Sequence, residues 1–130
     1  MRLPGRPGGP LLTAEGPETE LSLWAATGCE VQIALGSIAS LPIPRADREV
    51  VACLDHDARH KPSGRGARKT FRKWRRQGVN FTVAKPWAVR REDRSDFNDL
   101  LRERGTGAVE ERVLLALEPE GKPRRRMRCK

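Results

Sequence analysis

The stretch VVACLDHD, residues 50–57, decides the fold of this chain. Its first five residues, Val50–Leu54, are apolar without a break, which is typical of a central strand buried on both faces of a parallel sheet. Two acids, Asp55 and Asp57, follow the strand directly. Ligands of open α/β folds bind beyond the carboxyl ends of the strands. The stretch therefore predicts both a buried strand and a functional site at its end.

Strand and helix patterns alternate on both sides of this stretch. Apolar or alternating runs predict further strands at residues 11–14, 31–35 and 79–84. Helical spacing and stop residues predict helices at 18–27, 67–77, 96–103 and 107–117. Ser95 is the predicted N-cap of the third of these helices, and Gly105 ends it. This order predicts an α/β fold with a small parallel Rossmann-like sheet flanked by helices.

The chain has 130 residues, the size of one domain. Residues 1–10 are rich in Pro and Gly and are predicted to be a disordered lead. Residues 11–118 are the predicted folded domain, and residues 119–130 are a predicted basic tail. No stretch approaches the ~20 apolar residues of a membrane span. Three cysteines without CxxC or His-paired spacing argue against a structural zinc site and a disulfide framework. A cytoplasmic protein that does not contact membranes is expected.

Positive charge is concentrated in one segment. Lys and Arg number 26 against 17 Asp and Glu, a net charge of +9. The run RGARKTFRKWRR, residues 65–76, holds seven cations and no acid. Such clusters attract the phosphates of nucleic acids, although a solvated surface explains the charge alone equally well. The candidate phosphate-binding residues are Arg65, Arg68, Lys69, Arg72 and Arg76.

Further acids occur where the predicted fold would place a site. Glu15 follows the first strand, and Asp96 and Asp99 open the helix after the last strand. With Asp55 and Asp57, these acids suit Mg²⁺, a hard cation that takes carboxylate oxygens and substrate phosphates. Helix capping is the alternative explanation for each acid taken alone. Acids at several strand ends at once favour the metal site.

The aromatic residues allow two interpretations, packing in the core or stacking on a nucleic-acid base. Leu21, Trp24 and Ala25 form a helical apolar stripe that predicts a buried face, with Trp24 and Phe71 in the core. Trp74 lies among Arg and Lys residues, where stacking on a base is one interpretation and core packing is the favoured one.

Together these segments resemble a Toprim domain, most closely the Toprim segment of phage- and plasmid-type DNA primases and primase-helicases. The stretches that carry the resemblance are EGPET (15–19) followed by LSLWAATG, ALGS (34–37) followed by IASLPIP, LDHD (54–57) and SDFND (95–99). The resemblance implies Glu15 as a catalytic acid/base and metal ligand, Asp55 and Asp57 as Mg²⁺ ligands, and Asp96 as a supporting ligand. Mn²⁺ is an alternative ion.

The resemblance also implies a function: Mg²⁺-dependent nucleotidyl transfer on nucleic acid, expected to be DNA, with nucleoside triphosphates and further replication domains or subunits as partners. Two alternatives stay open. One is a Toprim nuclease, and the other is a catalytically degenerate nucleic-acid-binding module of a mobile-element replication or transfer protein. Pro17 departs from the family pattern beside Glu15, because proline fixes φ and removes a hydrogen-bond donor.

Overall fold

The computed structural model describes residues 2–34, 41–42, 44–45, 47–55, 63–87 and 96–117, with residues 63–66 described by their backbone. Within this part of the chain, the strands are β1 (Arg2–Leu3), β2 (Leu11–Ala14), β3 (Glu30–Ile33), β4 (Glu49–Cys53) and β5 (Asn80–Ala84). The helices are α1 (Pro17–Thr27), α2 (Ser63–Arg76), α3 (Phe97–Arg104) and α4 (Thr106–Leu117). Every predicted strand and helix named above is present, with its ends shifted by a few residues.

The five strands form one sheet in the order β1-β3-β2-β4-β5. β2 is central, and its Leu12 pairs in parallel register with Val31 of β3 and Val51 of β4. β5 extends the parallel part beyond β4, whereas β1 pairs antiparallel with β3. The prediction of an α/β, Rossmann-like fold is confirmed. The sheet is mixed rather than purely parallel, because the chain's first residues add an antiparallel edge.

The disordered lead predicted for residues 1–10 is wrong at that edge. Arg2 donates a hydrogen bond to Gln32 Oε1 at 2.9 Å and forms an ion pair with Glu30 at 2.9 Å. Gly5 passes so close to the Glu30 backbone that a Cβ atom at position 5 would overlap it. Glycine content suggested disorder, but here glycine permits close packing of two backbone segments.

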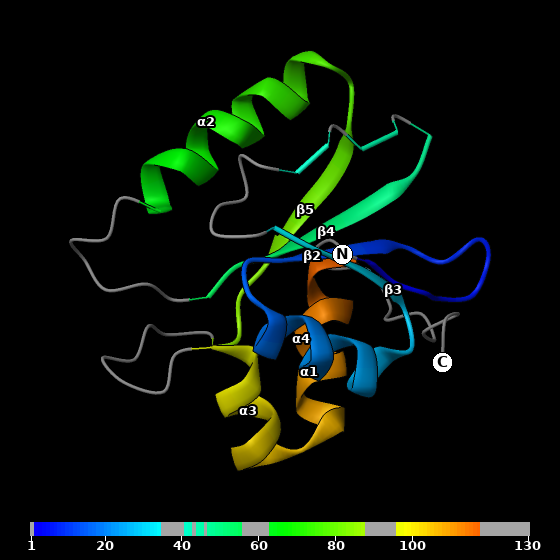
Figure 1. Ribbon diagram of the computed structural model, residues 1–130, viewed down its shortest axis with the longest axis vertical. Coiled ribbons are helices and arrows are strands. Elements are labelled where there is room, and N and C mark those ends of the chain that lie inside the picture. Colours follow the sequence, from blue (N-terminus) through cyan, green and yellow to red (C-terminus); the bar gives the residue numbers. More distant parts are fainter. Residues whose placement is uncertain are drawn as a thin grey trace.

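Helices cover both faces of the sheet (Figure 1). α1, α3 and α4 pack together on one face, and α2 lies on the other. The side chains of β4 alternate between the two cores. Val51 and Cys53 join the core under α1, α3 and α4, and Val50 and Ala52 join the core under α2. This alternation explains the unbroken apolar run, since both faces of the strand are buried.

The apolar stripe predicted to be buried on α1 faces outward instead. Leu21 is 55% exposed and Trp24 is 39% exposed, so the prediction of Trp24 as a core residue is wrong. The buried face carries Leu23 together with polar residues, including Ser22 and Thr27. Their hydroxyls donate to Glu18 O at 2.8 Å and Leu23 O at 2.7 Å within the same helix. These bonds satisfy the hydroxyl groups and allow a polar face to be buried.

The predicted end of α3 is confirmed and its predicted start is shifted. Asp96, not Ser95, is the N-cap, with extended backbone angles and a capping box shared with Asp99. Gly105 is the C-cap, and its N–H donates to Leu101 O at 2.8 Å. The Asp96 carboxylate accepts a hydrogen bond from the N3 backbone N–H, which is the role predicted for the Ser95 hydroxyl.

Among the cysteines, Cys53 is free and buried, whereas Cys29 is disulfide-bonded. The cysteine spacing argued against a disulfide framework, and the disulfide of Cys29 departs from that expectation. In the part of the chain described above, no helix is both long enough and apolar enough to cross a membrane.

Candidate metal centre and basic helix

Asp55 lies directly beyond β4, at the carboxyl edge of the parallel strands. The ladder continues one residue past the strand, since Leu54 N donates to Ala84 O at 2.9 Å. Asp55 is thus the first residue to leave the sheet, and it is half-buried. Its neighbour β2 ends at the same edge, because Thr13 of β2 pairs with Ala52 of β4.

Glu15 connects the end of β2 to α1. It follows Ala14, whose carbonyl accepts from Ala34 N at 2.7 Å, and it precedes Gly16, the N-cap of α1. Pro17 is the first residue of the helix. Proline suits this position because the N–H that it lacks has no partner within a helix. The departure from the family pattern at residue 17 is therefore compatible with a regular start of α1 beside Glu15.

Thr19, in the first turn of α1, contacts Asp55 across 36 positions of sequence. Its hydroxyl lies 3.2 Å from Asp55 Oδ1 and 3.4 Å from Oδ2. Thr19 is buried, with 2% of its surface exposed. The first turn of α1 therefore lies against the carboxylate that ends β4.

Asp96 approaches the same turn of α1 from α3. Its Oδ1 accepts from Asp99 N at 2.7 Å, and its own N–H donates to Asp99 Oδ2 at 3.3 Å. Burial raises the pKa of Asp96, and the nearby carboxylates of Asp99 and Glu18 also raise it, while the Asp99 N–H acts in the opposite direction. Glu18 is thus close enough to affect Asp96 electrostatically. One turn later, Ser22 Oγ and Asn98 Oδ1 lie 3.2 Å apart.

The structure thus brings Asp55 and the Asp96 segment to the first turn of α1, with Glu15 at its entry. Asp57 lies outside the described residues. Among those that are described, no three His, Cys, Asp or Glu side chains are close enough together to hold a metal ion. The donor chemistry suits Mg²⁺, because each candidate offers carboxylate oxygens. The ligand set as a whole remains a prediction.

The predicted basic helix is α2. Arg68, Lys69, Arg72 and Arg76 are exposed, as are Lys73 and Arg75, and the side chain of Arg65 lies outside the described residues. Trp74 is 1% exposed, which confirms core packing over base stacking. Its ring centroid lies 5.7 Å from that of Phe71 and 5.4 Å from that of Phe81. α2 therefore buries an aromatic face and presents its cations outward.

α2 begins at the edge of the sheet where Asp55 lies. It connects the parallel strands β4 and β5, so it runs back from the carboxyl edge to the amino edge (Figure 1). Arg68 and Lys69 are accordingly nearer to the acidic edge than Arg76 is. A polyanion bound along α2 would therefore come nearest to the edge where Asp55 lies at the first turns of the helix.

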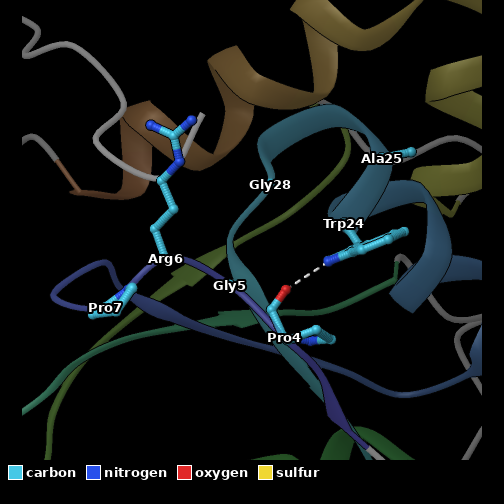
Figure 2. A pocket seen from close by; sticks show the side chains of 7 residues that line it. All are labelled: Pro4, Gly5, Arg6, Pro7, Trp24, Ala25 and Gly28. Carbon is cyan, nitrogen blue, oxygen red and sulfur yellow. Dashed lines mark hydrogen bonds between the residues drawn. The ribbon is translucent and has the colours of Figure 1, made fainter.

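A separate open hollow of about 670 Å³ lies at the opposite edge of the sheet, where β1 and α1 end (Figure 2). Trp24 lines it, and its indole Nε1 donates to Pro4 O at 2.7 Å. Arg6 and Pro7 also line the hollow. None of the predicted site residues that the structure describes is among those lining this hollow.

Two residues near the predicted site were not singled out from the sequence. Thr19 and Glu18 belong to the EGPET stretch but had no predicted role. A threonine in the first turn of a helix is a weak signal, since it suits a helix start without any partner outside the helix. Its contact with Asp55 depends on the pairing of β2 with β4, which local sequence does not specify.

Comparison with known families identifies the fold. The family model of the Toprim domain matches residues 11–107, a segment that includes Glu15, Asp55, Asp57 and Asp96. Searches of curated proteins and of solved structures gave no significant match. The matched segment contains β2 to α3 and thus the carboxyl edge of the parallel strands, where Asp55 lies. The chain belongs to the Toprim domain family.

Proposed function

We propose that this Toprim domain carries out Mg²⁺-dependent nucleotidyl transfer on DNA, as the Toprim module of a primase-like replication protein. One observation carries the proposal. Two segments that are far apart in the sequence, one ending at Asp55 and the other beginning at Asp96, both approach the first turn of α1. This turn lies beyond the carboxyl ends of the parallel strands. Membership of the Toprim family supports metal-dependent chemistry on nucleic acid. The primase role goes further than the family match.

In this proposal Glu15, Asp55 and Asp57 hold Mg²⁺, with Mn²⁺ as a substitute, and Asp96 supports them. Glu15 also acts as the general acid/base. The ion, when bound, would neutralise charge on a phosphate and lower the pKa of a bound nucleophile. Asp96 can assist while it caps α3, because one carboxylate has more acceptor positions than the Asp99 N–H uses.

The cations of α2 bind the phosphates of the nucleic acid. Arg68, Lys69, Arg72 and Arg76 are exposed on a helix without an acid, and Arg65 belongs to the same helix. Phosphate contacts supply most of the affinity of nonspecific nucleic-acid binding. Nucleoside triphosphates are the proposed second substrate, and other replication domains or subunits are the proposed protein partners.

The test is primer synthesis on single-stranded DNA with Mg²⁺ and nucleoside triphosphates. Asp55→Asn and Asp57→Asn should each lower the rate about a hundredfold or more, because metal-ion catalysis contributes several kcal/mol. Asp47→Asn is the matched control, since Asp47 is an exposed acid paired with Arg45 away from this edge. Full activity in the Asp55 and Asp57 variants would contradict the metal site. Cleavage of labelled DNA without triphosphates would instead indicate a Toprim nuclease.

A second candidate function is nucleic-acid binding without catalysis, by a module of a mobile-element protein. It is favoured by the acid-free exposed face of α2. This function predicts salt-sensitive DNA binding that is unchanged by Mg²⁺. Calorimetric titration with MgCl₂ up to the millimolar range distinguishes the two functions.

A further inference from the structure

Thr19 differs from the other buried hydroxyl residues of α1. Ser22 and Thr27 donate to carbonyls four residues earlier in their own helix, at 2.8 and 2.7 Å. The hydroxyl of Thr19 instead contacts Asp55, which lies on a different element. A buried hydroxyl requires a partner, and for Thr19 that partner is the carboxylate at the end of β4.

The hydroxyl lies beside both oxygens of the carboxylate. The two distances, 3.2 and 3.4 Å, are similar and longer than the ~2.7 Å of a strong hydroxyl bond. One hydroxyl proton serves one oxygen at a time, and each carboxylate oxygen has more than one acceptor position. The contact also fixes the direction in which Asp55 leaves the sheet, toward the turn that follows Glu15.

We infer that Thr19 is a positioning residue for the metal centre: its hydroxyl orients the Asp55 carboxylate for a divalent cation. This inference depends on the proposed function, since it requires Asp55 to be a metal ligand. Groups that hydrogen-bond to metal-binding carboxylates set their orientation, and their loss commonly lowers metal affinity about 10–100-fold. Thr19 acts through Asp55 and does not itself contact the ion.

The experiment measures the Kd for Mg²⁺ by calorimetry, without nucleic acid. Thr19→Val removes the donor while it keeps the shape of the side chain, and it should weaken Mg²⁺ binding about 10–100-fold. Thr19→Ser retains the hydroxyl and should restore affinity close to that of the wild type. Thr19→Ala is a second donor-free variant for the case in which valine prevents folding. Thermal unfolding of each variant confirms that the folded state is being titrated.

Ser22→Ala is the matched control, because it removes a buried hydroxyl one turn further along α1 that does not contact Asp55. Its Mg²⁺ affinity should equal that of the wild type. Wild-type affinity in Thr19→Val, together with loss of binding in Asp55→Asn, would overturn the role of Thr19 and leave the proposed function standing. Absence of Mg²⁺ binding in the wild type would overturn the proposed function and this role with it.

Discussion

The two faces of the sheet are stabilised in different ways. Under α1, α3 and α4, the packed residues include buried polar side chains, among them Thr19, Glu20 and Ser22. Under α2, three aromatic rings, those of Phe71, Trp74 and Phe81, lie against one another with centroids 5.1–5.7 Å apart. The first face places specific groups beside Asp55, and the second anchors a cationic helix. Positioning a site demands directional contacts, whereas anchoring a helix demands apolar area.

The largest expected effect is on the aromatic face. Trp74→Ala should lower the free energy of unfolding by about 3–5 kcal/mol, because it removes a fully buried indole and leaves a cavity. Trp24→Ala is the control on the other face, where the exposed indole makes one hydrogen bond to Pro4 O. Its cost should be about 1 kcal/mol. Urea unfolding measures both, and equal losses would show that α2 is not anchored by its aromatic residues.

The next effect concerns the outer side of α2. Arg68→Gln combined with Arg72→Gln should weaken binding to duplex DNA and reduce the slope of log K against log salt by about 1.8, or 0.9 for each lost phosphate contact. Arg6→Gln combined with Arg102→Gln removes the same charge from exposed positions elsewhere. Fluorescence anisotropy over a range of salt concentrations compares the two pairs. An equal reduction in slope for both pairs would mean that net charge, rather than α2, determines binding.

The smallest effect concerns Glu20, which is 1% exposed and whose Oε2 has no hydrogen-bond partner within the described part of the chain. Burial raises its pKa. The native state therefore binds the proton more tightly than the unfolded state does, and this group's contribution to stability falls as pH rises above the ordinary glutamate pKa of about 4.3.

Glu20→Gln should consequently raise stability by about 1 kcal/mol near pH 8, with little change near pH 4. Urea unfolding at both pH values measures the difference. A loss of stability at pH 8 would show that the carboxylate is well satisfied in the native state. The polar face would then be more completely hydrogen-bonded than the structure indicates.

The sequence predicted the order of strands and helices because apolar periodicity and stop residues are local signals. Val50–Leu54 was recognisable as a strand buried on both faces, and Gly105 as a helix end. The outward orientation of Leu21 and Trp24 was not predictable from the sequence. Periodicity shows that a helix has an apolar face, but it does not show which face packs inward. On α1, internal hydrogen bonds allowed the polar face to be buried instead.

For the candidate site, only the location of single residues can be compared with the prediction. The family match covers the acids, and the position of Asp55 after its strand follows from the local pattern. The contacts around it were not predictable, because Thr19 meets Asp55 through the pairing of β2 with β4. The capping bond of Asp96 is local, yet Ser95 was an equally suitable cap by residue type. Asp57 lies outside the described residues, and its role remains a prediction.

The length of α2 determines how many base pairs of a bound duplex can lie along it. Fourteen residues at 1.5 Å each give a helix of about 21 Å, which equals about six base pairs of duplex at 3.4 Å per pair. Since α2 starts at the edge of the sheet where Asp55 lies, a duplex held along its whole length would have one end at that edge and the other about half a helical turn away. A duplex much shorter than six base pairs would leave the last cations of α2 without a phosphate.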